Sequence, residues 1–138
     1  MSEDRPIVNP QPRRNADGTT TVTTLDAGDV RLLCPSWCRV QHGYLHQPAK
    51  ADIAHRSESE WALVETPETG PTSFVQAGLV QWPFSQQSQV FLDVETDDGF
   101  KQVGPTAARE IAAALRAHAD YIDAMAAKLV AIRAGEDQ

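Results

Sequence analysis

Two cysteines and three histidines lie close together in the sequence. The segment Cys34-Pro-Ser-Trp-Cys38 is followed by His42 and His46, so a side chain with a sulfur or nitrogen ligand atom recurs every four residues, and His55 comes next. Zinc favours thiolate and imidazole ligands, and structural zinc ions usually have four of them in a tetrahedron. We therefore predict that this segment binds one structural Zn²⁺ ion per chain.

The backbone must turn within the metal segment. In a continuous helix, residues 34 and 46 would be about 18 Å apart along the axis, which is too far for both to bind one ion. Pro35 favours a turn between the cysteines, and Gly43 frees the backbone just after the first histidine. The two cysteines and His42 can then form three corners of the site. The fourth corner is either the neighbouring His46 or the more distant His55.

The same residue types also serve purposes other than binding structural zinc. The cysteines could form a disulfide, remain two free thiols or bind iron, although a redox-active pair usually has the shorter Cys-x-x-Cys spacing. A catalytic zinc keeps one position open for water and needs a nearby base, which Glu58 or Glu60 could supply. The sequence lacks the His-x-Glu and Cys-x-x-Cys pattern of zinc deaminases. We therefore expect the protein not to be an enzyme.

The residues on either side of the metal segment predict short strands. Thr and Val residues between 19 and 33 predict two strands joined by the turn Asp26-Ala-Gly-Asp29. Three further strands are predicted, at 61–65, 73–82 and 89–95. Asp97-Asp98-Gly99 is predicted to be the turn that ends the last of them. Together these segments predict a small antiparallel sheet of about five strands.

A long helix is predicted at 105–134. Apolar residues, with one histidine among them, recur at alternating intervals of four and three and form one face of this helix; they are Ile111, Leu115, His118, Ile122, Met125, Leu129 and Ile132. We expect this face to pack on the sheet, which makes the fold class α+β. The same spacing is used by short coiled coils, so the helix could also form a homodimer.

Domain organisation and location follow from composition. Residues 1–17 contain three prolines and few residues that could be buried, and are predicted to be a disordered N-terminal arm. Residues 18–134 are then a single zinc-containing domain. No segment is apolar enough to span a membrane, and the first residues do not resemble a secretion signal. We expect a cytoplasmic protein, where thiols are reduced and a cysteine pair more often binds metal than forms a disulfide.

The distribution of charge disfavours a nucleic-acid partner. The chain carries a formal charge of −7, and residues 57–100 contain eight acidic residues and no basic one. Such a surface repels phosphates, whereas nucleic-acid binding needs clustered Lys and Arg. Binding through Arg31, Arg39, Lys50 and Arg56, or mimicry of DNA by the acidic surface, is the alternative function. Our main expectation is a protein-interaction or regulatory module whose partner the sequence does not identify.

The metal segment also resembles a known family. Cys-Pro-Ser-Trp-Cys, His42 and the segment Ile53-Ala-His55-Arg-Ser57 are similar to the motif of a small domain family of unknown function found in actinobacteria and their phages. The resemblance covers about residues 19–130. It implies that Cys34, Cys38, His42 and His55 are the zinc ligands and that His46 is an additional residue. It implies no activity.

Overall fold

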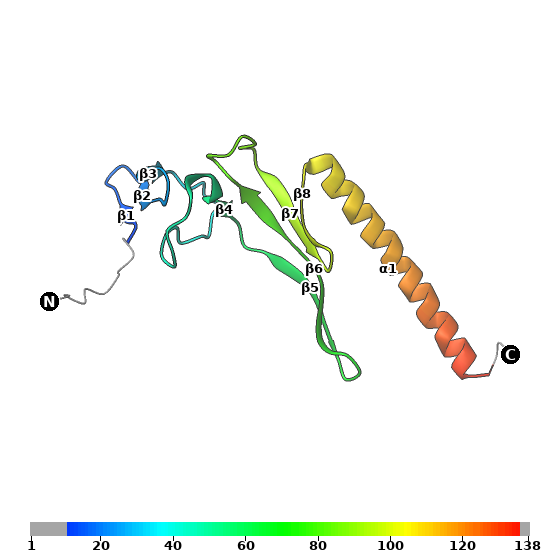
Figure 1. Ribbon diagram of the computed structural model, residues 1–138. Helices are drawn as coiled ribbons and strands as arrows, with labels where there is room; N and C mark the ends of the chain where they lie inside the picture. The colour runs from blue at the N-terminus through cyan, green and yellow to red at the C-terminus, as the bar shows by residue number, and fades with distance from the viewer. Residues whose placement is uncertain (1–10, 136–138) are drawn as a thin grey trace. The chain divides into compact units, whose positions relative to one another are not determined.

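The computed structural model describes residues 11–135, which form an α+β fold, as predicted (Figure 1). Two antiparallel sheets precede one long helix. In chain order the elements are β1 (Arg13–Arg14), β2 (Thr20–Thr23), β3 (Asp29–Leu32), the 3-10 helix η1 (Lys50–Asp52), β4 (His55–Arg56), β5 (Glu60–Thr66), β6 (Gly70–Gln81), β7 (Phe91–Thr96), β8 (Gly99–Val103) and α1 (Pro105–Arg133).

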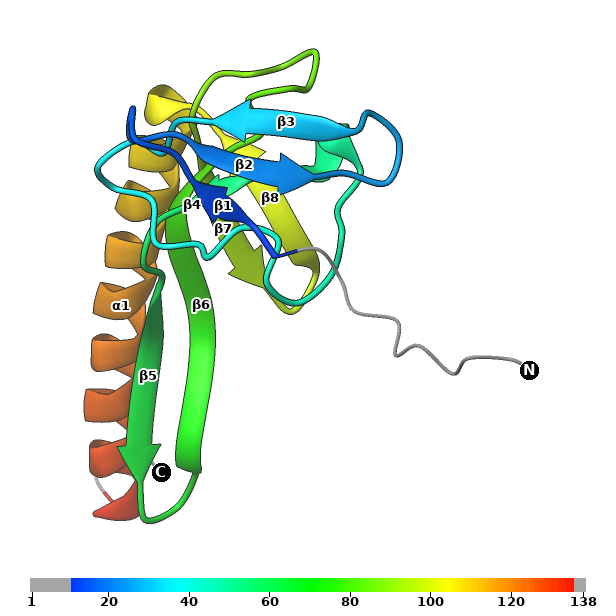
Figure 2. The same cartoon turned by 90° about the vertical axis from the view of Figure 1, so that its left-hand side faces the viewer.

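The strands are divided between two sheets. The first has the order β1-β2-β3, and the second is built around β6, whose one edge pairs with β7 and whose other edge pairs with both β4 and β5. Strand β8 lies beyond β7. Figure 2 shows β5 and β6 as a long hairpin. The metal segment is the connection between the first sheet and the second.

Five of the strands were predicted correctly, and β1, β4 and β8 were missed. The hairpin at 19–33 and the strands at 61–65, 73–82 and 89–95 correspond to β2, β3, β5, β6 and β7. Strand β8 follows the predicted turn at Gly99, and β4 has only two residues. The predicted disordered arm is corrected in part, because Arg13–Arg14 pair with Thr20–Thr21 as β1. Residues 1–10 of that arm lie outside the described residues.

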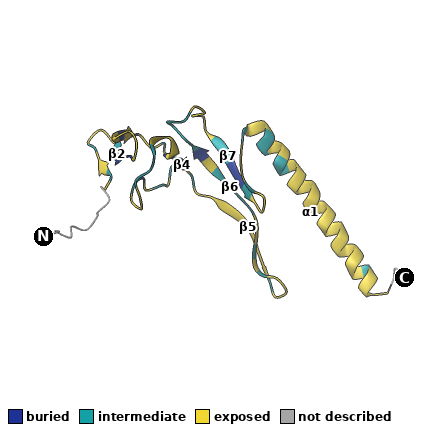
Figure 3. Ribbon diagram, viewed as in Figure 1, coloured by how far each residue is buried: buried dark blue, intermediate teal, exposed yellow. Residues whose placement is uncertain are grey.

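The buried apolar core is small. Among the described residues, buried hydrophobic side chains come from the first sheet, from the end of the metal segment and from the second sheet (Figure 3); they are Val22, Val30, Leu32, Ile53, Val80 and Val94. Most are β-branched residues, which suit the pleated surface of a sheet. The core therefore has one part in each sheet, with the metal segment between them.

The chain divides into two compact units, one up to Gln102 and one from Val103 onward. Helix α1 belongs to the second unit and has 29 residues, with Pro105 in its first turn. Over residues 105–133 no side chain is buried. The predicted packing of the helix on the sheet, and the single domain at 18–134, stay predictions. No helix within residues 11–135 has both the length and the apolar character needed to cross a membrane.

Gly78 provides a test of packing within the second sheet. A Cβ atom at this position would lie 3.0 Å from Ser59 Oγ and 3.2 Å from the Glu58 carbonyl oxygen. Because a backbone oxygen cannot move aside easily, we expect Gly78→Ala to lower the free energy of unfolding by roughly 1–3 kcal/mol. Urea unfolding followed by circular dichroism measures this loss. Ser73→Ala, on an exposed residue of the same strand, is the control and should change stability little.

Candidate metal centre

The structure brings the four predicted ligands together. One ligand atom from each of Cys34, Cys38, His42 and His55 lies within 4.8 Å of the other three. Cys38 Sγ and His42 Nε2 are 3.6 Å apart. Zn–S and Zn–N bonds of about 2.3 and 2.05 Å at a tetrahedral angle place sulfur and nitrogen about 3.6 Å apart. The spacing of these side chains is therefore compatible with a tetrahedral metal site.

A tight turn holds the two cysteines. Cys34 follows the end of β3 by two residues, so the first sheet determines where the metal segment begins. The Cys38 N–H then donates to the Pro35 carbonyl oxygen at 3.0 Å, which closes the turn that Pro35 predicts. Because this turn brings residues four apart to the same side, both sulfur atoms can face one ion.

Gly43 turns the chain after His42, as the sequence predicts. Its φ is +78°, in the left-handed region that favours glycine. A Cβ atom here would also lie 3.2 Å from Cγ1 of Val22, which is almost completely buried. Glycine is therefore required by both the backbone conformation and the packing. His42 is held against the first sheet as a result, with 8% of its surface exposed.

His55 reaches the site from the second sheet. It lies in β4, opposite Gln81 of β6, and 2% of its surface is exposed. The Arg39 N–H donates to the carbonyl oxygen of Arg56 at 2.8 Å, so the segment after Cys38 is bonded to this strand. The His55 ring also makes an edge-to-face contact with Trp37, at 6.3 Å between centroids. Trp37 is thus a packing residue beside the site.

One nitrogen atom of His55 lacks a hydrogen bond. Nδ1 is buried, and among the described residues it has no hydrogen-bond partner. A buried polar atom without a partner costs free energy, commonly about 1–3 kcal/mol, so native structures rarely tolerate one. A metal ion bound to the ring would use such a nitrogen as a ligand atom. The residues present therefore fit a metal ion.

The electrostatics of the cluster suit a cation. Burial, and to a lesser extent the neighbouring His55, lowers the pKa of His42 to about 4. Burial also lowers the pKa of His55. Both imidazoles are therefore neutral at pH 7, which is the form that binds metal. Partial shielding of the Cys34 sulfur from water, together with the neighbouring Cys38, raises the pKa of Cys34 to about 11, so a thiolate here needs a nearby positive charge. A metal ion supplies that charge.

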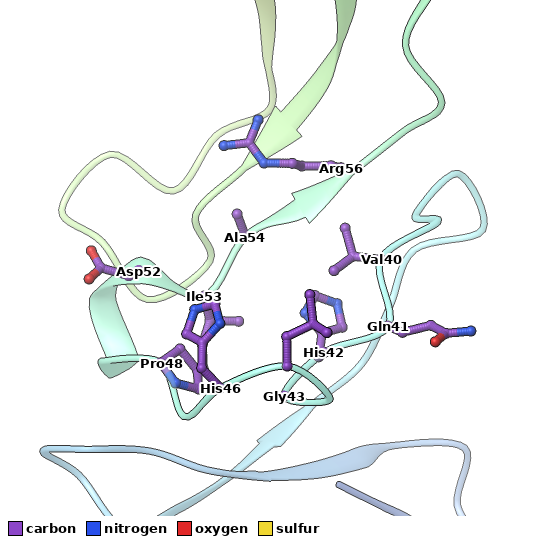
Figure 4. Close-up of a pocket in the computed structure, with 11 residues that line it drawn as sticks. Val40, Gln41, His42, Gly43, His46, Pro48, Asp52, Ile53, Ala54 and Arg56 are labelled. Carbon is purple, nitrogen blue, oxygen red and sulfur yellow. The ribbon is translucent and has the colours of Figure 1, made fainter. Parts of the chain in front are cut away.

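His46 lies outside the cluster of four. It lines an open pocket of about 250 Å³, together with Pro48, Asp52 and Ile53. Figure 4 shows His46 beside Pro48, and His42 on the opposite wall of this pocket. Residue spacing alone left His46 and His55 open as the fourth corner. The structure groups His55 with the other three residues, in agreement with the family resemblance.

A polar network next to the site was not predicted. Arg56 Nη1 lies 3.2 Å from Oδ2 of the buried Asp93, and Gln102 donates to the other carboxylate oxygen of Asp93. The Arg56 guanidinium also lies over the Trp82 ring, 5.5 Å from its centroid. These contacts connect β4, which carries His55, to other strands of the second sheet. They are far apart in the sequence and form no motif.

Comparison with known proteins identifies a family for almost the whole described chain. A family model described as a domain of unknown function (DUF6907) matches residues 19–131. No curated protein and no solved structure matches the chain. The matched residues include all four members of the cluster and most of α1.

Removing single ligands tests the composition of the site. We expect Cys34→Ser and His55→Ala to abolish stoichiometric metal binding, because three ligands leave the tetrahedron incomplete. His46→Ala is the control and should retain one metal ion per chain. The measurement is metal content by mass spectrometry after gel filtration of zinc-loaded protein. Cys34 is exposed, so its replacement by serine should leave packing intact. Loss of metal in His46→Ala with retention in His55→Ala would contradict the assignment.

Proposed function

We propose that this chain, which belongs to the DUF6907 family, is a small non-enzymatic protein in which one structural Zn²⁺ ion holds a protein-interaction surface in place. The observation that carries this proposal is the convergence of two thiols and two imidazoles within 4.8 Å. A set of two cysteines and two histidines is typical of structural zinc sites in proteins. Thiolate ligands also disfavour magnesium and calcium, which prefer oxygen.

Several features support a structural ion over a catalytic one. Four protein ligands complete a tetrahedron and leave no position for water or substrate. Within residues 11–135, no carboxylate belongs to the cluster. Glu58, which could have served as a base, has its carboxylate 3.9 Å from the Arg39 guanidinium. The position of His46 outside the cluster adds no further ligand or base at the ion.

The proposed zinc ion connects the two sheets. Cys34 follows the last strand of the first sheet, and His55 lies in the first strand of the second. Binding of zinc to small structural sites releases on the order of 10 kcal/mol. The six buried apolar side chains contribute about the same in total, at about 2 kcal/mol each. The ion would therefore be comparable to these six side chains together as a source of stability.

A protein partner suits the surface better than a nucleic acid does. Four arginines of this unit already face carboxylates; the pairs are Arg13–Asp29, Arg31–Asp17, Arg39–Glu58 and Arg56–Asp93. Lys50 lies over the Phe84 ring, 5.2 Å from its centroid. A phosphate would have to displace these contacts. By contrast, Tyr44 and Trp61 are about half exposed, and aromatic side chains of this kind are common at protein interfaces.

Trp82 and Phe84 contribute to the proposed surface in a different way. Both are partly buried, and with Phe91 they line an open pocket of about 670 Å³. Such a pocket can accept an apolar side chain of a partner.

We place the protein in the cytoplasm. Cysteines bind zinc only when they are reduced, and the cytoplasm keeps thiols reduced. Both cysteines of this chain are free thiols.

X-ray absorption of the zinc-loaded protein distinguishes a structural ion from a catalytic one. We expect two sulfur atoms at about 2.3 Å and two nitrogen atoms at about 2.0–2.1 Å from the ion. A coordination shell with three protein ligands and one water oxygen would contradict the structural role. Removing zinc with a chelator should lower the melting temperature of the protein, and adding zinc back should restore it.

Capture from a native extract tests the interaction surface. We expect the zinc-loaded chain to retain a specific protein partner, and Trp61→Ala to weaken that retention without changing the circular dichroism spectrum. Thr72→Ala, on the strand paired with β5, is the control. Duplex DNA should show no binding at 50 mM salt. DNA binding that weakens steeply between 50 and 200 mM salt would instead support the nucleic-acid alternative.

A further inference from the structure

Helix α1 carries a continuous apolar stripe that is exposed. The stripe consists of Ile111, Leu115, His118, Ile122, Met125, Leu129 and Ile132. Leu115, Ile122 and Leu129 expose 49%, 56% and 47% of their surface, and Figure 3 shows the helix as exposed over most of its length. From residue 111 to residue 132 the stripe is about 32 Å long. Exposed apolar surface of this extent indicates an interaction site.

The residues beside the stripe are small on one side and mixed on the other. Ala112, Ala119 and Ala126 border the first side up to Arg133, and Ala114, Tyr121 and Lys128 border the second. In a pair of helices these bordering positions lie against the partner, and their side chains determine how closely the two axes approach. Alanine permits a close approach along the first side, and the exposed Tyr121 widens the apolar surface on the second. The surface is therefore shaped for another helix with the same narrow apolar stripe, which a second copy of α1 provides.

Charge decides the orientation of such a pair. In a parallel pair in register, Lys128 would lie beside Arg133 of the second copy, and like charges at these positions repel. His118 would also meet its own copy in the apolar seam. In an antiparallel pair, Lys128 lies beside Ala114 of the second copy, so this repulsion is absent. The helix dipoles also oppose each other, which is favourable.

We propose that two copies of this chain associate through an antiparallel pair of α1 helices. Ile111 then lies opposite Leu129, Leu115 opposite Met125 and His118 opposite Ile122. This register gives the stripe of each copy an apolar partner along its length and avoids a layer of two histidines. The association needs no metal, so it is independent of the proposed zinc function and can fail or succeed separately from it.

Sedimentation of the full-length chain tests the association. We expect a dimer for the native chain and a monomer for Ile122→Asp, which places a charge in the middle of the stripe. Ala127→Asp is the matched control, because it adds the same charge on the opposite face of the same helix, and it should remain a dimer. Circular dichroism checks that both variants keep their helix. A native chain that is monomeric at micromolar concentration would overturn the proposal, as would a dimer unaffected by Ile122→Asp.

Cross-linking tests the orientation. In the proposed register, Ala119 lies opposite Ala119 of the second copy, whereas Ala126 lies opposite Ala112. A short bismaleimide should therefore link zinc-loaded Ala119→Cys into covalent dimers and leave Ala126→Cys largely unlinked. The chain without an added cysteine, measured alongside, corrects for Cys34 and Cys38. Equal linking of the two variants would overturn the antiparallel arrangement, because a parallel pair places every residue level with its own copy.

Discussion

The convergence of four ligand atoms on one point is the constraint on which the first unit depends. The two sheets have separate small cores, and the segment between them contains little regular structure. The position of Cys34 is determined by the end of β3, and the position of His55 by the pairing of β4 with β6. A metal ion bound by these residues would therefore fix the two sheets relative to each other, at a place where apolar packing is sparse.

Several residues around the cluster help to position the four ligand side chains. The turn at Pro35 and the left-handed Gly43 bring three ligands to one side of the loop, and the Arg39–Arg56 backbone hydrogen bond fastens the loop to β4. Arg56 in turn is held by the buried Asp93 of β7. The geometry of the site is thus determined well beyond the residues that would touch the metal, as is usual for metal centres.

The parts of this structure that could be predicted are those with local causes. Cys34, Cys38 and His42 follow from residue types and from turns at Pro35 and Gly43, whereas the choice of His55 over His46 came from the family resemblance. The β2–β3 hairpin follows from its turn residues. Strands β1 and β4 have two residues each, too few to show a periodic pattern. Strand β4 also pairs with residues of β6 that are distant in the sequence. The Arg56–Asp93 pair likewise joins residues 37 apart in the sequence, from β4 and β7, which lie on either side of β6.

The small core also has a consequence for the lifetime of the protein in a cell. Proteases cleave a chain in proportion to the fraction of time that the chain is unfolded, and that fraction depends on the free energy of unfolding. With zinc bound as we propose, a large share of this free energy would come from a ligand whose concentration the cell controls. The abundance of the chain would then follow the supply of free zinc, with the metal-free form degraded first, without any dedicated sensor.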